Sequence, residues 1–345
     1  MQTKLQSIKS GGMLTGVLKW AGAIAVPIAV FAVFLLCQGV NPIETYANMI
    51  TSTFGNSYGR GEVIIKSAPF ILIAAATCLS SKAGLVNVGG EGQFALGALF
   101  STAAAMFLVK DAPAVIGIAV MALAGIAGGM IWGGIAVGLK VKANMNETIT
   151  TVILNYIAYE LVSFMVYGPL KDPDSFNWPQ TPEISEQLQL PSIVSGVNAG
   201  IIIAVIFAVA VWYVTKKTRW GYKLKVIGSN PLAAVHAGYN VGKTQVIAML
   251  ISGGMSGLAG MLEIAGVEMR LRQTTGSNYG YLGFLAAWMA WNNPLAAIIT
   301  AFIMGFLFIS GNVLEMSSGL PSSTVRILMS IVLLAILWKG KGDKK

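Results

Sequence analysis

The chain has 345 residues, of which 55% are hydrophobic and only 11% are charged, and its mean hydropathy is +0.70. Soluble domains carry about 25% charged residues, so the composition excludes an ordinary soluble protein. It predicts an all-α fold, a polytopic bundle of membrane-spanning helices. The net charge of +9 then indicates which segments lie on which side of the membrane, and it gives no reason to expect nucleic-acid binding.

The apolar runs predict about ten membrane spans, since about 20 apolar residues cross one bilayer. They are long and continuous, unlike the short alternating segments of a membrane barrel. The predicted spans cover residues 18–37, 63–80, 93–109, 113–139, 147–167, 198–215, 244–266, 280–292, 294–312 and 321–338. The eighth span is short, and it is either re-entrant or begins earlier than this.

Lysine and arginine are concentrated in the segments that lie on one side of the membrane if these spans alternate. The positive-inside rule assigns that side to the cytoplasm and predicts that both termini are cytoplasmic. The lysine-rich start followed by an apolar run resembles a signal peptide. No small-residue cleavage site follows, so we expect residues 18–37 to be the first span of one transmembrane domain, 1–345.

A glycine-rich polar stretch, "GLVNVGGEGQ", separates the second and third spans at residues 84–93. Its glycines permit irregular backbone, which a membrane tolerates only against protein or along a water-filled path. Glu91 is placed to interact with the positive end of a helix dipole. The stretch is therefore a structural breakpoint, or a substrate contact through Asn87, Glu91 or Gln93.

The fifth span begins with Asn146 and Glu147 and carries Asn155 further in. Glu147 suits a first-turn acid facing the helix dipole, and a place on the substrate path is the alternative for all three residues.

Charged residues within spans are costly and usually face a partner or a water-filled path. Arg326, Glu263 and Glu160 lie within predicted spans, with the two acids at depths that Arg326 could reach. We expect an ion pair between Arg326 and one of these acids, with a path-lining role as the alternative.

Small residues recur at four-residue spacing in two spans. Gly125, Gly129 and Gly133 lie in one span, and Gly253 and Gly257 lie in another. This spacing lets helix backbones approach closely in lipid, and a substrate path lined by these helices is the alternative.

Two predicted loops are long enough to carry function. The outer loop, residues 168–197, is rich in proline and acids, which suits an exposed connector or a docking surface. The inner loop, residues 216–243, is basic and contains a short helix that Asn230 can cap and Gly238 can end. Such a helix has no core of its own, so it should lie on lipid headgroups or on another protein.

Patterns typical of catalysis are incomplete. "GMSG" at residues 254–257 resembles an intramembrane serine protease motif, but the single histidine, His236, lies in the inner loop. "AGYNVGKT" at residues 237–244 resembles a phosphate loop, yet a membrane span follows and no partner acid is evident. Because no cluster of metal-ligand residues occurs, we expect a transport protein without a catalytic or metal site.

Three stretches together resemble a known family. They are "GLVNVGGEGQFALGA" from Gly84, "NETITTVILNYIA" from Asn146 and "GSNPLAAVHAGYNV" from Gly228. In this order they resemble the permease subunits of ATP-binding-cassette importers, in the group that carries branched-chain amino acids, ribose and nucleosides. The nucleoside permeases of the guanosine type are the most similar.

The resemblance implies a multi-pass subunit of a prokaryotic plasma membrane that imports a nucleoside. It implies three partners: an external binding lipoprotein, a related second permease and a cytoplasmic ATPase. Because the ATPase would bind the ATP and Mg, we expect this chain to bind no cofactor. The inner-loop helix is similar to the family's coupling helix, and the matching positions are Asn230, Ala233, Ala234 and Gly238. Alternatives are a sugar or amino acid permease of the same kind, an ion-coupled secondary transporter and a membrane enzyme.

Overall fold

The computed structural model describes residues 25–176, 178–194 and 196–342, and the chain divides into two compact units. One unit comprises Gly61–Gly305, and the other comprises the chain up to Arg60 together with Phe306 onward. The prediction of one transmembrane domain over the whole chain stays a prediction.

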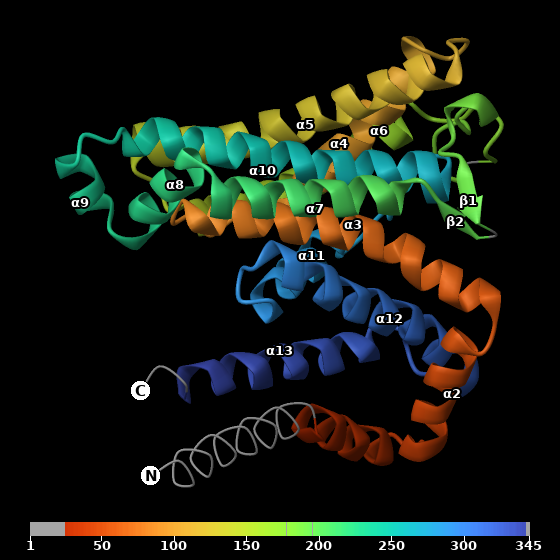
Figure 1. The fold of residues 1–345 in the computed structure, drawn as a ribbon. Coiled ribbons are helices and arrows are strands. Elements are labelled where there is room, and N and C mark those ends of the chain that lie inside the picture. Colours follow the sequence, from red (N-terminus) through yellow and green to blue (C-terminus); the bar gives the residue numbers. More distant parts are fainter. Residues whose placement is uncertain (1–24, 177, 195, 343–345) are drawn as a thin grey trace, which may run out of the picture. The chain divides into compact units, whose positions relative to one another are not determined.

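The Gly61–Gly305 unit is mainly helical, with one long connection between α6 and α7 that contains a pair of short strands (Figure 1). Its helices are most of α3 (Ser57–Lys82), α4 (Gly90–Phe107), α5 (Ala114–Ala143), α6 (Glu147–Tyr167), α7 (Gly200–Lys217), α8 (Arg219–Ser229), α9 (Pro231–His236), α10 (Val241–Glu263), the π-helical turn η2 (Ile264–Glu268), α11 (Tyr279–Met289) and the first part of α12 (Pro294–Ser318).

Glycine sets the packing at the centre of this unit, where α4, α5 and α10 contact one another. A Cβ atom added to Gly257 would lie 2.1 Å from the carbonyl oxygen of Gly125, and one added to Gly97 would lie 2.3 Å from the Cα of Gly257. The three backbones are therefore in direct contact. This geometry agrees with the packing interpretation of the glycine spacing.

The other described unit contains a sharply bent helix pair. A helix over Ala25–Cys37 is followed by α2 (Pro42–Phe54), and the two axes meet at 114°. Asn41 caps α2 by accepting a hydrogen bond from the backbone N–H of Ile43, and the Tyr46 hydroxyl donates to the carbonyl of Ile28 at 2.7 Å. The unit also contains the end of α12 and α13 (Thr324–Gly342).

Every predicted span whose residues are described coincides with a helix, and residues 18–24 of the first lie outside the described residues. Among the described residues six helices are long and apolar enough to cross a membrane, or seven if the bent pair counts as one span. The eighth predicted span is the 11-residue α11, which at about 1.5 Å per residue is too short to cross alone. The count of ten and the cytoplasmic location of the termini stay predictions.

The loop predicted at residues 168–197 is not simply an extended connector. It contains the 3₁₀ turn η1 (Glu186–Leu188) and an antiparallel pair of short strands, β1 (Ser192–Val194) and β2 (Val197–Asn198). Four of its apolar side chains are buried: Leu170, Ile184, Leu188 and Leu190. Their burial gives the segment a packed structure that its proline content does not predict.

Candidate functional site

The glycine-rich stretch forms a non-helical passage between α3 and α4. Residues 85–88 follow a turn in which Gly84 has φ of +73°, and α4 begins at Gly90. Because Asn87, Glu91 and Gln93 are all buried, their polar groups need partners within the protein.

The side-chain amides of Asn87 and Gln93 form hydrogen bonds with each other. The Asn87 Nδ2 donates to Gln93 Oε1 and to Ser252 Oγ of α10, both at 3.1 Å, and its Oδ1 accepts from the backbone N–H of Gly89 at 3.0 Å. The Gln93 amide donates back to Asn87 Oδ1 at 3.2 Å. These contacts hold the non-helical segment against α10, and neither side chain lines the cleft described below.

Glu91 lies in the first turn of α4, but its carboxylate caps a different helix. One carboxylate oxygen accepts from the backbone N–H of Gly280 at 2.6 Å and from that of Tyr281 at 3.3 Å. The other oxygen accepts from the backbone N–H of Asn278 and from the Tyr159 hydroxyl. The N-terminal amides of α11 thus find their acceptor in a side chain far away in sequence, in an arrangement favoured by the helix dipole.

Asn155 connects α6 to the same region. Its Oδ1 accepts from the backbone N–H of Gly92 at 2.9 Å, and its Nδ2 donates to the carbonyl of Val88 at 3.1 Å and to the Tyr281 hydroxyl at 3.2 Å. The side chain therefore joins the start of α4, the non-helical passage and α11.

A cleft of about 520 Å³ opens where these elements meet. It is lined by two carboxylates, three tyrosines, three amides and two aliphatic hydroxyls: Glu91, Glu160, Tyr156, Tyr159, Tyr281, Asn155, Gln273, Asn278, Thr274 and Ser277. The volume lies within the range of about 300–1,000 Å³ typical of small-molecule sites.

The charge of the cleft restricts its ligand. Among the described residues that line it, two are acidic and none is a lysine or arginine. Glu91 already accepts four hydrogen bonds, whereas Glu160 is exposed and makes no hydrogen bond or ion pair within the described chain. The cleft is therefore suited to a ligand that donates hydrogen bonds and has no negative charge.

The structure brings Glu91, Asn155 and Glu160 together, while most of the cleft lining comes from residues that the sequence analysis missed. One signal was present: Asn155, Tyr156, Tyr159 and Glu160 recur at the three- and four-residue spacing of a single helix face. The residues between Gln273 and Tyr281 carried no comparable pattern.

The predicted path residues Asn146 and Glu147 lie at the N-terminal start of α6 and do not line the cleft. Asn146 caps the helix by accepting from the backbone N–H of Thr148 at 2.9 Å. Glu147 pairs with Lys140 at 2.6 Å and accepts from the backbone N–H of Val86 at 3.4 Å. Both residues have a structural role in these contacts, and their predicted place on a substrate path is untested.

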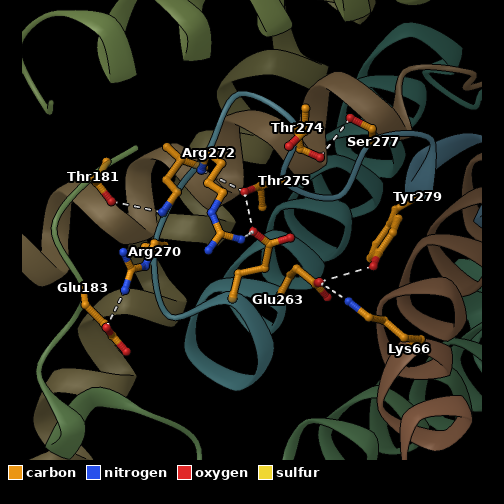
Figure 2. Close-up of polar contacts among 12 residues, drawn as sticks. Lys66, Thr181, Glu183, Glu263, Arg270, Arg272, Thr274, Thr275, Ser277 and Tyr279 are labelled. Atoms are coloured by element: carbon orange, nitrogen blue, oxygen red, sulfur yellow. Dashed lines mark hydrogen bonds and ion pairs between the residues drawn. The ribbon is translucent and has the colours of Figure 1, made fainter. Parts of the chain in front are cut away.

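Figure 2 shows a second polar network at the C-terminal end of α10. Glu263 is fully buried and pairs with Lys66 of α3 at 2.6 Å, and the Tyr279 hydroxyl donates to it at 3.3 Å. One of the two acids expected to pair with Arg326 thus has a lysine partner. Arg326 lies on α13 in the other unit, and its predicted ion pair stays a prediction.

A separate set of contacts in Figure 2 attaches the 168–197 loop to the segment after η2. The backbone N–H of Ile184 donates to the carbonyl of Met269 at 2.8 Å, and Glu183 pairs with Arg270 at 2.6 Å (Figure 2). Arg272 pairs with Glu268 at 3.3 Å. This segment continues directly into Gln273 and Thr274 of the cleft, so the loop supports one wall of the cleft.

The inner-loop helix forms as the sequence predicts. Asn230 caps α9 by accepting from the backbone N–H of Ala233 at 3.1 Å, and Gly238 follows the helix with φ of +79°. Ala234 is fully buried within the chain, whereas Leu232 and Val235 are 75% and 58% exposed. The Ala234 side chain therefore has no surface of its own to offer a partner, and the coupling role of Asn230, Ala233, Ala234 and Gly238 stays a prediction.

Comparison with known proteins agrees with this architecture. Residues 60–337 match the model of the branched-chain amino acid transport system / permease component family. The chain is 32% identical to the glucose ABC transporter permease protein TsgB13 of Haloferax volcanii, over 90% of this chain and 84% of that protein. It is 30% identical to the guanosine ABC transporter permease protein NupP of Bacillus subtilis, over 91% of each chain.

A third relative, the nucleoside ABC transporter permease protein NupB of Lactococcus lactis, is 27% identical over 89% of this chain and 87% of its own length. The family match covers most of the chain, and these relatives are aligned over nearly their full length. The chain therefore belongs to the family of branched-chain amino acid transport system permease components.

Proposed function

We propose that this chain is the membrane-spanning permease subunit of an ATP-binding-cassette importer that carries a nucleoside. The observation that carries the proposal is the cleft between α4, α6 and α11, with its tyrosines, amides and carboxylates and no cationic side chain.

The cleft chemistry argues against a branched-chain amino acid. Such a substrate carries a carboxylate, which needs a cation or a set of free donors, and an aliphatic side chain, which needs an apolar pocket. The described lining has no lysine, arginine or aliphatic residue. Tyr156 and Tyr281 offer aromatic rings on which a base can stack, and the amides offer both donors and acceptors.

A simple sugar is the second candidate, because a relative of 32% identity is named as a glucose permease. Sugars and nucleosides are both neutral hydrogen-bond donors, so both suit the charge of the cleft. Two relatives named for guanosine and nucleosides, together with the aromatic lining, favour the nucleoside.

We assign the energy source to a separate cytoplasmic ATPase, which would bind the ATP and Mg. Support comes from α9, which presents Leu232 and Val235 to solvent. An exposed apolar pair on a short, capped helix is suited to insertion into a groove on a partner. The basic residues around α9 agree with the predicted cytoplasmic side of a prokaryotic plasma membrane.

A second permease subunit and an external binding lipoprotein complete the proposed importer. Tyr156 and Glu160 are exposed on α6, a helix long and apolar enough to span the membrane. A charge within a span is costly in contact with lipid. A second subunit that covers this face of α6 would remove that contact and enclose the cleft.

The proposal is tested by measuring uptake of labelled guanosine in cells that express the chain together with a cytoplasmic ATPase, a second permease subunit and a binding lipoprotein. We expect uptake to stop when ATP is depleted and to continue when an uncoupler collapses the ion gradient while ATP is held constant. Uptake that follows the ion gradient would identify a secondary transporter instead.

A further inference from the structure

Of the two carboxylates that line the cleft, only Glu160 has no hydrogen-bond or ion-pair partner in the described chain. Glu91 accepts four hydrogen bonds from Tyr159 and the start of α11. Glu160, in contrast, lines the cleft and has no hydrogen-bond or ion-pair partner in the described chain. A ligand in the cleft therefore meets one carboxylate with its acceptor positions free.

The position of Glu160 within a predicted membrane span indicates a function, because a charged side chain there costs free energy. It lies 13 residues after Glu147 in the 21-residue helix α6, about 20 Å along the axis at 1.5 Å per residue. A charged side chain within a span costs at least about 2.5–3.5 kcal/mol on insertion scales, and such residues usually face a partner or a water-filled path.

The geometry points to a specific ligand group, and we propose that Glu160 binds the vicinal diol of the substrate. A carboxylate has two oxygens that can accept one hydrogen bond each, and the 2′- and 3′-hydroxyls of a ribose are two adjacent donors at matching separation. Bidentate hydrogen bonds to an ionised acceptor are among the strong ones in proteins. This inference rests on the proposed function, because it assumes that the cleft holds the transported molecule.

The remaining lining is consistent with this orientation. Tyr156 lies four residues before Glu160 and so on the same face of α6, where its ring can contact the base. Asn155, in contrast, is already occupied by Gly92, Val88 and Tyr281, as Glu91 is by α11. Glu160 is therefore the acidic residue on which recognition of the sugar depends.

The same chemistry is compatible with the two substrate names among the relatives. Ribose in a nucleoside and glucose both carry adjacent hydroxyls, while their remaining groups differ. A diol-binding carboxylate recognises the shared group, and the tyrosines and amides distinguish the rest.

The test compares guanosine with 2′-deoxyguanosine, which lacks one hydroxyl of the diol. Uptake of each is measured in the complete transporter, with the same binding protein and ATPase, for the wild type and for Glu160→Gln. Because the binding protein is identical in both, a change in the ratio of the two uptake efficiencies arises in the permease.

We expect Glu160→Gln to lower guanosine uptake efficiency by about tenfold, as for loss of one hydrogen bond to a charged acceptor, and to leave 2′-deoxyguanosine uptake nearly unchanged. The control variant is Glu44→Gln, which removes an exposed acid of α2 outside the cleft, and it should keep the wild-type ratio.

If Glu160→Gln left the ratio of guanosine to 2′-deoxyguanosine uptake unchanged, whether or not both uptakes fell, the diol assignment would be overturned. The proposal of nucleoside transport would remain. A wild-type transporter that takes up neither nucleoside would instead remove the proposed function, and the diol assignment with it.

Discussion

The capping of α11 by Glu91 leads to a quantitative prediction for Glu91→Gln. The carboxylate accepts hydrogen bonds from the backbone N–H groups of Asn278, Gly280 and Tyr281 and from the Tyr159 hydroxyl. A glutamine keeps one acceptor oxygen and replaces the other with an NH₂ group, which would face donors. If the NH₂ faced Gly280 and Tyr281, two backbone donors would lose their acceptor; if it faced Asn278 and Tyr159, only the Asn278 N–H would, because the Tyr159 hydroxyl can turn to accept.

Each buried donor left without an acceptor costs about 1–3 kcal/mol, so the loss of one or two acceptors in Glu91→Gln should lower the free energy of unfolding by about 1–6 kcal/mol. The measurement is reversible unfolding of the purified chain in mixed micelles. Because the carboxylate also orders the segment that lines the cleft, uptake should fall as well.

Glu160→Gln is the matched control, since it makes the same chemical change in the same cleft at an exposed carboxylate without a partner in the described chain. Its stability should equal that of the wild type. If Glu91→Gln were within about 0.5 kcal/mol of the wild type, the range of an ordinary surface substitution, the capping role of Glu91 would be refuted.

Three further predictions follow from contacts elsewhere in the molecule. Gly257→Ala should prevent a monodisperse, folded product in size-exclusion chromatography, because its Cβ would lie 2.1 Å from the carbonyl of Gly125, whereas Gly138→Ala, with nothing within 4 Å, should behave as the wild type. Lys66→Met should lower the free energy of unfolding by about 3–5 kcal/mol, because it leaves Glu263 buried without its cation. Adding Glu263→Gln to this variant should restore part of the loss. If Lys66→Met alone were as stable as the wild type, the ion pair would be contradicted. Leu232→Asp combined with Val235→Asp should abolish co-purification with the ATPase without altering the thermal unfolding of the chain, and retained co-purification would show that α9 is not the docking helix.

Local features of the fold could be predicted from the sequence because they depend on neighbouring residues. The long apolar helices follow from the apolar runs, and the start and end of α9 follow from Asn230 and Gly238. Helix α2 was not predicted, because its 13 residues are too few to form a membrane span and its start depends on the bend after Cys37.

The candidate site could be predicted only in part, because its contacts join residues far apart in the chain. Glu91 was expected at the dipole of its own helix, yet it caps α11, which begins at Tyr279. Glu263 or Glu160 was expected to pair with Arg326 on the basis of depth in the membrane, and depth does not identify the neighbouring helix that carries Lys66, the partner of Glu263. Burial of Ala234 likewise depends on how α9 packs, which helical spacing in a six-residue segment does not determine.

The most direct test of the account is uptake by the complete transporter in proteoliposomes, with the binding protein outside and ATP inside. We measure labelled guanosine uptake in the presence of excess unlabelled guanosine, glucose or leucine. The account predicts ATP-dependent uptake that guanosine alone suppresses strongly. Uptake that proceeds without ATP, or that leucine suppresses as strongly as guanosine, would contradict it.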